Sequence, residues 1–159
     1  RVSGLCDDSL QGDRIYRQYY EKLKAGCPTL SLADCPDLGP VLFALAALKN
    51  GAVLVGTDRL AAKESDRGRA MHEELLKLGG GLEFGENLIT VSKQNLAYGG
   101  KVLDGHNDHR IVMSAAILSC LCSIPVDIFG AEAIEKSYPH FFEDFNSLGG
   151  KADVINDGK

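Results

Sequence analysis

The sequence lacks several features that would assign it to a particular class of protein. Its 159 residues contain no apolar run close to the roughly 20 residues that a membrane-spanning helix needs, and no signal-peptide pattern opens the chain. Positive charge is not in excess either, because the formal net charge is −5. A general nucleic-acid surface needs a basic excess. We therefore expect neither a membrane nor a nucleic acid as a partner.

Cysteine is sparse and irregularly placed. The five cysteines form no C-x-x-C pair and show no zinc-like spacing with the four histidines. The run Gly79–Gly81 has neither the spacing nor the preceding strand of a dinucleotide-binding or Walker loop. We expect no metal site, and reduced thiols in or near the core of a cytoplasmic protein.

The composition that remains is that of one ordinary globular domain. Hydrophobic residues make up 45 % of the chain and charged residues 25 %, and the length is sufficient for a sizeable core. The chain begins with Arg1 rather than Met, which suggests a piece of a longer protein.

The hydrophobic pattern predicts alternating helices and strands. Residues 41–49 and 111–122 are apolar on every side, which is typical of helices buried between layers. Further helices are expected at 14–24, 68–78 and 138–148. Strands are expected at 1–5, 29–32, 52–56, 125–129 and 152–155, with a hairpin of 82–84 and 88–91 around Gly85-Glu86-Asn87.

The segment Lys63-Glu64-Ser65-Asp66-Arg67 leads into an amphipathic helix that stops at Gly79. Ser65 or Asp66 can cap its start. Spacings of three and four residues place one ridge on the core side, made of Glu64, Arg67, Met71, Leu75 and Leu78. An acid and a cation are then aimed at the protein body near a helix N-terminus, a position that favours anions.

The chain contains an internal repeat. Asp37 and Lys63 are 26 positions apart, as are Arg110 and Lys136, and the second pair follows the first by 73 positions. The repeat predicts units at about 34–103 and 104–159, with the remnant of an earlier unit at 1–33.

Corresponding points of a repeat tend to lie on one rim of the domain. Lys63, Arg67, Arg110 and Lys136 would then form an electropositive pocket suited to phosphate and carboxylate groups, with Asp37 and Glu64 as base and acid among them. Each residue also has a simpler interpretation: Asp37 as a helix cap, or Lys136 as a solvated loop lysine.

Four ordered motifs resemble those of the 5-enolpyruvylshikimate-3-phosphate (EPSP) synthase family. They are Pro36-Asp37-Leu38, Lys63-Glu64-Ser65-Asp66-Arg67, the segment Asn107-Asp108-His109-Arg110-Ile111-Val112-Met113, and Lys136-Ser137-Tyr138-Pro139 followed by Phe141-Phe142. The family's chain is more than twice as long, so the resemblance is to its C-terminal part. It implies an α/β fold of repeated βαβαββ units around buried parallel helices, a partial inside-out α/β barrel. The active site would lie in the cleft between this domain and the N-terminal portion of the same chain.

The resemblance also implies a reaction. The enolpyruvyl group of phosphoenolpyruvate would be transferred to the 5-hydroxyl of shikimate 3-phosphate with release of phosphate, in the shikimate pathway to chorismate and aromatic amino acids, without a metal or cofactor. Arg67, Arg110 and Lys136 would hold phosphoenolpyruvate, and Asp37 and Lys63 would contact shikimate 3-phosphate. Asp37 would accept the proton, and Glu64 would help to protonate the methylene carbon.

Two alternatives stay open. A sister enolpyruvyl transferase that acts on UDP-N-acetylglucosamine shares the fold, although its cysteine-based site is not seen here. The chain alone could also be a non-catalytic module that holds an anion, and we expect the isolated chain to be inactive.

Overall fold

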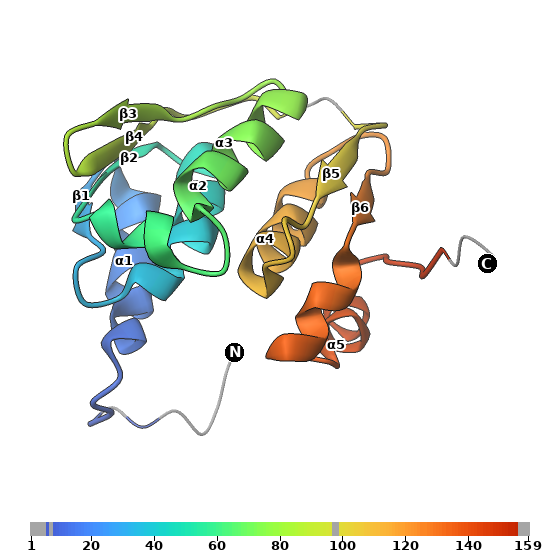
Figure 1. Ribbon diagram of the computed structural model, residues 1–159. Coiled ribbons are helices and arrows are strands. Elements are labelled where there is room, and N and C mark those ends of the chain that lie inside the picture. Colours follow the sequence, from blue (N-terminus) through green and yellow to red (C-terminus); the bar gives the residue numbers. More distant parts are fainter. Residues whose placement is uncertain (1–5, 7, 97–98, 156–159) are drawn as a thin grey trace.

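The computed structural model of the chain describes residues 6, 8–96 and 99–155 (Figure 1). After a 3-10 turn at Gly12–Ile15 and helix α1 (Tyr16–Ala25), the chain forms one βαβαββ unit. Its elements are β1 (Thr29–Ser31), α2 (Gly39–Leu48), β2 (Ala52–Val55), α3 (Arg67–Lys77), β3 (Glu83–Gly85) and β4 (Leu88–Val91). A second unit repeats this order as far as its second helix, with β5 (Val102–Asp104), α4 (His109–Ser119), β6 (Asp127–Phe129) and α5 (Phe141–Ser147). The predicted α/β fold with βαβαββ units is confirmed.

The strands of the first unit form one mixed sheet in the order β1-β2-β4-β3. β1 and β2 are parallel, with Leu30 opposite Leu54, and they are joined through α2, as a parallel pair requires. β4 runs antiparallel to both β2 and β3. The predicted hairpin is confirmed as β3 and β4, and its turn residue Asn87 has a φ of 49°. β5 and β6 form a separate parallel pair.

The two units keep the predicted spacing of 73 residues. β1 at 29–31 corresponds to β5 at 102–104, and the 3-10 turn Asp58–Ala62 corresponds to the turn Ala131–Lys136. The helices at corresponding positions, α2 and α4, pack directly against each other. Polar residues that precede these helices therefore come close in space although they are far apart in the sequence. The division of the chain at residues 34 and 104 stays a prediction.

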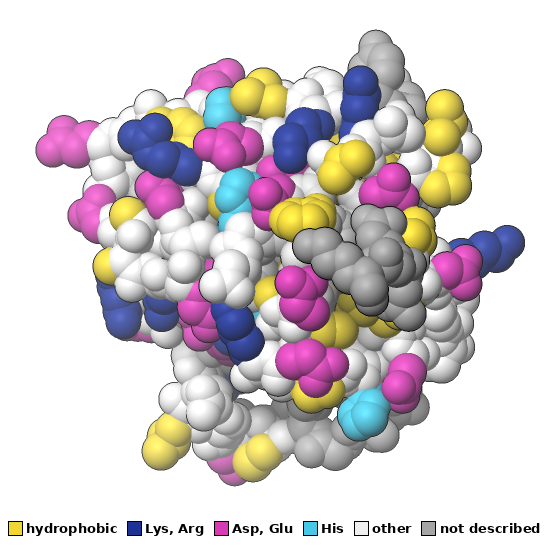
Figure 2. Space-filling model, turned by 45° about the vertical axis from the view of Figure 1, so that its right-hand side comes forward, with side chains coloured by type: hydrophobic (Ala, Val, Ile, Leu, Met, Phe, Trp, Pro, Cys, Tyr) yellow, Lys and Arg dark blue, Asp and Glu magenta, His cyan; other side chains and the backbone are white. Residues whose placement is uncertain are grey.

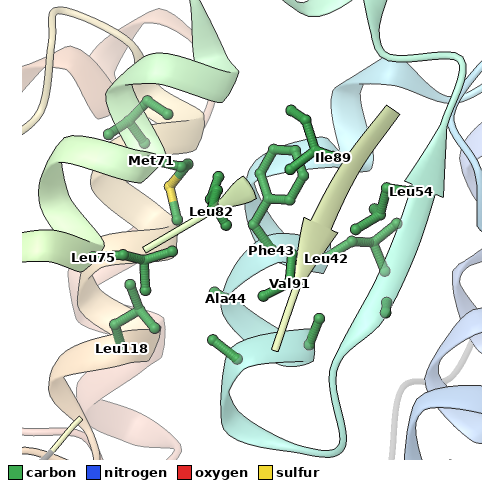
Figure 3. Close-up of a cluster of buried hydrophobic side chains, with 14 of the residues drawn as sticks. Leu42, Phe43, Ala44, Leu54, Met71, Leu75, Leu82, Ile89, Val91 and Leu118 are labelled. Carbon is green, nitrogen blue, oxygen red and sulfur yellow. The ribbon is translucent and has the colours of Figure 1, made fainter. Parts of the chain in front are cut away.

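Helix α2 lies between the four-stranded sheet and helices α3 and α4 (Figures 1 and 3). It has no polar face, and its Leu42 and Phe43 are fully buried. Met71 and Leu75 cover it from α3, and Ile89 covers it from β4 (Figure 3). A helix that is apolar all round is stable only where other elements surround it. Neither α2 nor any other helix in the described ranges is long and apolar enough to cross a membrane.

The predicted inward ridge of α3 is confirmed except at its start. Its buried members are Arg67, Met71, Leu75 and Leu78. The expectation for Glu64 is wrong, because Asp66 caps the helix by accepting a hydrogen bond from the Arg69 amide. Glu64 therefore lies in the loop before the helix, and its side chain is 40 % exposed.

Two predicted elements differ from the structure. No strand forms at 152–155, because this segment pairs with no other strand within the described residues. The last helix begins at Phe141 rather than Tyr138, since Pro139 disfavours helical geometry in the residue before it. The strand expected at 1–5 lies outside the described residues.

All five cysteines are free thiols, as expected, but they are less buried than expected. Cys35 is buried, and burial together with the carboxylates of Asp13 and Asp34 raises its pKa to about 11. Cys122 is half-buried. The remaining cysteines, Cys6, Cys27 and Cys120, are exposed, so the expectation of core or near-core positions is wrong for these three. Cys120 follows the last residue of α4, where the helix reaches the surface.

Replacing Leu75 by alanine should lower the free energy of unfolding by about 2–5 kcal/mol, because a fully buried leucine leaves a cavity. The adjacent Leu76 is 54 % exposed on the same helix, so Leu76→Ala is a matched control that should cost less than about 1 kcal/mol. Urea denaturation followed by circular dichroism measures both changes. Equal costs would contradict this placement of the core.

Candidate functional site

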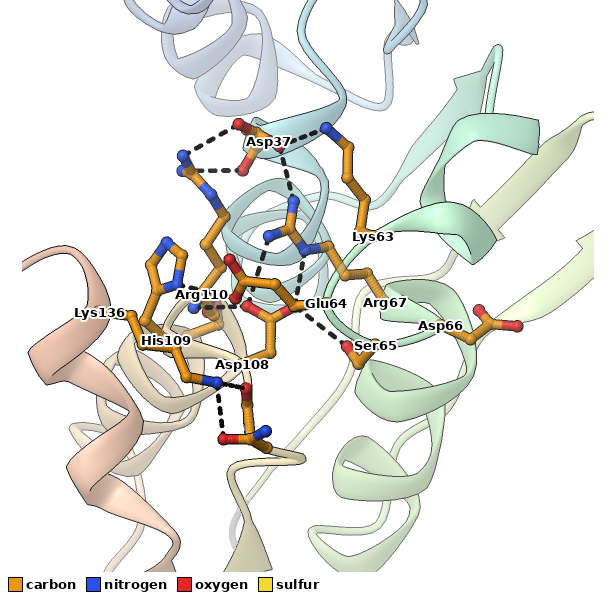
Figure 4. Close-up of polar contacts among 12 residues, drawn as sticks. Asp37, Lys63, Glu64, Ser65, Asp66, Arg67, Asp108, His109, Arg110 and Lys136 are labelled. Atoms are coloured by element: carbon orange, nitrogen blue, oxygen red, sulfur yellow. Dashed lines mark hydrogen bonds and ion pairs between the residues drawn. The ribbon is translucent and has the colours of Figure 1, made fainter.

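Polar side chains from both units meet where α2, α3 and α4 begin (Figure 4). Asp37 comes from the 3-10 turn before α2, and Lys63 from the loop before α3. Arg67 is the first residue of α3, and Asp108 and Arg110 stand at the start of α4. We refer to these five residues as the Asp37 cluster.

Asp37 accepts from three cations. Its Oδ1 lies 3.0 Å from Lys63 Nζ and 2.7 Å from Arg67 Nη1. Its Oδ2 lies 3.1 Å from Arg110 Nη2, and Arg110 Nη1 also donates to the backbone carbonyl of Asp37 at 3.3 Å. Burial alone would raise the pKa of Asp37, but the hydrogen bonds from Lys63 and Arg67 and the charge of Arg110 outweigh it, and the pKa is lowered. In this arrangement Asp37 is ionised and is a weak proton acceptor.

Arg67 and Asp108 form a buried ion pair at the centre of the cluster. Their side chains are 2 % and 0 % exposed, and Arg67 Nε donates to Asp108 Oδ2 at 2.8 Å. The same carboxylate accepts from Ser65 Oγ at 3.1 Å and from the Arg110 amide at 2.9 Å, which caps α4. Burial alone would raise the pKa of Asp108, but these bonds lower it. Such complete hydrogen bonding is what allows a charge pair to be buried.

Two buried polar atoms, Nε of Arg110 in the cluster and Nδ1 of His109 beside it, have no hydrogen-bond partner among the described residues. Glu64 Oε2 lies 2.9 Å from His109 Nδ1 but is not aligned for a hydrogen bond. The Glu64 carboxylate is 40 % exposed and can therefore exchange protons with water. Arg110 Nε is itself buried, so a ligand would meet the partly exposed guanidinium of Arg110 at other atoms.

Lys136 lies beside the cluster rather than in it. It ends the 3-10 turn before α5, and its Nζ donates to the backbone carbonyl and the side-chain oxygen of Asn107 (Figure 4). Asn107 immediately precedes Asp108. The structure therefore brings four of the predicted binding residues into contact, namely Asp37, Lys63, Arg67 and Arg110. The fifth, Lys136, lies outside the cluster and is hydrogen-bonded to Asn107 in the loop before α4.

Sequence analysis missed the part that Asp108 plays as the counter-ion of Arg67. Asp108 was named only as part of the motif that begins at Asn107, whereas in the structure it both caps α4 and pairs with Arg67. The signal was present, because Arg67 lies on the inward ridge of α3 and a buried arginine needs a carboxylate. The contacts of Ser65 and Asn107 had no comparable signal.

The Asp37 cluster is rich in cations within an acidic chain. Three cations face two carboxylates, so one positive charge is left over. The surface in Figure 2 carries Lys and Arg side chains intermixed with Asp and Glu, without a broad basic patch on the face shown. An anion would therefore be held by a few directed bonds from arginine and lysine rather than by a general positive field.

A metal ion fits this place less well. Glu64, Asp108 and His109 offer ligand atoms within 4.8 Å of one another. However, the oxygens of Asp108 already accept from Arg67 and from the Arg110 amide. A cation would have to displace the buried guanidinium to reach them.

Comparison with known sequences gives one consistent result. The sequence profile of the family described as EPSP synthase (3-phosphoshikimate 1-carboxyvinyltransferase) matches residues 11–145. The 3-phosphoshikimate 1-carboxyvinyltransferase of Clostridium kluyveri is 41 % identical, with 98 % of this chain and 40 % of that protein aligned. The enzyme of the same name from Clostridioides difficile is 38 % identical, with 99 % and 40 % aligned. The chain thus spans about two fifths of the length of these curated relatives.

Solved structures agree with the sequence matches. EPSP synthase from Acinetobacter baumannii superposes with a TM-score of 0.66 at 32 % identity, over 74 % of this chain and 28 % of that one. The enolpyruvyl transferase NikO from Streptomyces tendae superposes with a TM-score of 0.64 over 79 % and 28 % of the two chains. Its identity is 15 %, so it supports the fold alone.

The Asp37 cluster should make stability depend on pH. The pKa values of Asp37 and Asp108 are lower in the folded chain than the value near 3.8 expected when unfolded. Their ionised forms therefore stabilise the fold above about pH 4, and this contribution is lost as the pH falls through the folded-state values. Asp108→Asn should lower the free energy of unfolding at pH 7 by about 3–5 kcal/mol, because the buried Arg67 loses its buried carboxylate partner and keeps only the partly exposed Asp37.

Urea denaturation between pH 7 and pH 2.5 tests this expectation. The difference between wild type and Asp108→Asn should shrink on acidification, when the wild-type carboxyl is protonated as well. Asp66→Asn is the control, because asparagine caps a helix as well as aspartate does and residue 66 is partly exposed. A cost of Asp108→Asn that is the same at every pH would contradict the ion pair.

Proposed function

Since the chain belongs to the EPSP synthase family, we propose that it is the C-terminal part of an enzyme that transfers the enolpyruvyl group of phosphoenolpyruvate to the 5-hydroxyl of shikimate 3-phosphate and releases phosphate. The names of the relatives favour this reaction over that of the sister transferase acting on UDP-N-acetylglucosamine. Free cysteines fit a cytoplasmic location for this enzyme of chorismate and aromatic amino-acid biosynthesis.

The Asp37 cluster is the observation that carries the proposal. Arg110 is suited to grip the carboxylate or phosphate of phosphoenolpyruvate, because its side chain is 27 % exposed and its two Nη atoms, which now contact Asp37, form a fork that matches such groups. Arg67 is held by Asp108 through its Nε. The nitrogen of Arg67 that would bind a ligand is therefore Nη1, which contacts Asp37 in this structure. Lys136 would complete the phosphoenolpyruvate site by giving up its hydrogen bond to Asn107 and donating to the substrate instead.

In this proposal Asp37 and Lys63 face shikimate 3-phosphate. Asp37 accepts the proton of the 5-hydroxyl as the oxygen attacks phosphoenolpyruvate. Its lowered pKa makes it a weak base as long as Lys63, Arg67 and Arg110 contact it. An anion that draws these cations away raises the pKa of Asp37, so substrate binding itself prepares the base. In this proposal Glu64 helps to protonate the methylene carbon, and its exposure to water next to His109 supports that role.

Replacing Asp37 by alanine in the full-length protein should lower turnover by at least about 10²-fold, because the proton acceptor is lost. A coupled phosphate-release assay with both substrates measures the rate, and circular dichroism checks the fold. Asp34→Ala is the matched control, since this acid lies three residues away on the surface. Near-normal turnover of Asp37→Ala would contradict the assigned role.

The isolated chain of 159 residues should fold and show no turnover. Catalysis of this kind requires two anions held in register in a dry cleft, and Lys63 and Arg110 are each 27 % exposed to water here. The same assay on the isolated chain and on the full-length protein compares the two. A rate within about tenfold of the full-length enzyme would show that the site is complete without the remainder.

A further inference from the structure

A second polar cluster lies farther along α3, outside the Asp37 cluster. At its centre is Glu74, whose side chain is only 1 % exposed. Its Oε1 lies 2.8 Å from His106 Nε2, and its Oε2 accepts from the Asp104 amide at 2.9 Å. Lys77 Nζ donates to both oxygens, at 2.9 and 2.8 Å. A buried carboxylate is thus fully bonded to the end of β5 and to the loop after it.

This loop has an unusual backbone. His106 and Asn107 both have a positive φ, of 50° and 52°, which side-chain-bearing residues rarely adopt twice in succession. Gly105 is held close to the end of β6, since its amide donates to the Phe129 carbonyl at 2.8 Å. A Cβ at Gly105 would meet Val112 Cγ2 at 2.6 Å. Contacts from elsewhere are needed to keep such a conformation.

The same loop supplies the functional site. Asn107 holds Lys136 through its two oxygens, and Asp108 holds Arg67. Helix α3 therefore contacts the loop at two points, through Arg67 at its first turn and through Glu74 two turns later. The second contact lies outside the site, yet it fixes the residue next to Asn107.

We propose that Glu74 and His106 are positioning residues, which hold the β5–α4 loop in the strained conformation that presents Asn107 to Lys136 and Asp108 to Arg67. An effect of these residues on the KM for substrate rests on the proposed function, whereas their effect on the conformation of the loop does not. Glu73, Glu74 and His106 also have the spacing of metal ligands. Lys77 already occupies both oxygens of Glu74 with a positive charge, so the geometry favours a positioning role.

The test compares His106→Leu with His106→Gln in the full-length enzyme. Leucine removes the donor to Glu74, so we expect the KM for phosphoenolpyruvate to rise about tenfold or more while kcat changes less. Glutamine keeps an N–H group that can reach Glu74 and should restore the KM to within about threefold of wild type. His72→Leu is the matched control, because it also removes one histidine hydrogen bond, which His72 Nδ1 on α3 accepts from the Leu82 amide away from this loop.

A second readout does not depend on activity. Acetylation of Lys136 relative to the exposed Lys151, measured by mass spectrometry, should increase about threefold in His106→Leu and stay near wild type in His106→Gln. If His106→Leu does not fold, Glu74→Gln replaces it with the same expected direction in both readouts. An inactive wild type would refute the proposed function only. Unchanged KM and unchanged labelling, or a glutamine variant no better than leucine, would overturn the positioning role.

Discussion

The structure depends on the buried ion pair of Arg67 and Asp108. It joins the first residue of α3 in one repeat unit to the cap of α4 in the next, and neither side chain reaches water. Removing two charges from water is costly, so the pair is maintained only because every oxygen of Asp108 is bonded and Arg67 has a second carboxylate in Asp37. The ends of three helices are thereby held at one place.

The repeat explains why these residues meet. α2 and α4 occupy corresponding positions 73 residues apart and pack against each other, so the segments before them lie on the same rim. Asp37 and Arg110 are 73 positions apart, at corresponding places in the two units, and they carry opposite charges and are in direct contact. A repeated fold can thus bring a carboxylate and a guanidinium into contact although no local sequence pattern predicts that contact.

Sequence reasoning was sound where periodicity is strong. The all-apolar character of α2 and the ridge of α3 predicted burial correctly, because both patterns extend over several helical turns. It did not find β5 or the partner of Arg67. The β5 segment has only two apolar residues, Val102 and Leu103, between the charged Lys101 and Asp104. The Arg67–Asp108 pair spans 41 positions, so only the fold reveals it. Glu64 was misplaced because Asp66 caps the helix, which begins at Arg67, three residues after Glu64.

The charge balance of the Asp37 cluster limits what this chain can bind. Its three cations and two carboxylates leave one positive charge, whereas the two proposed substrates each carry more than one negative charge. An unscreened mismatch of one charge at 4 Å costs about 4 kcal/mol near a protein surface. The balance can be restored by Lys136 turning toward the ligand, by protonation of Asp37, or by cations from the remainder of the proposed enzyme. The second route ties substrate binding to proton transfer, and the third makes the domain interface a condition for tight binding.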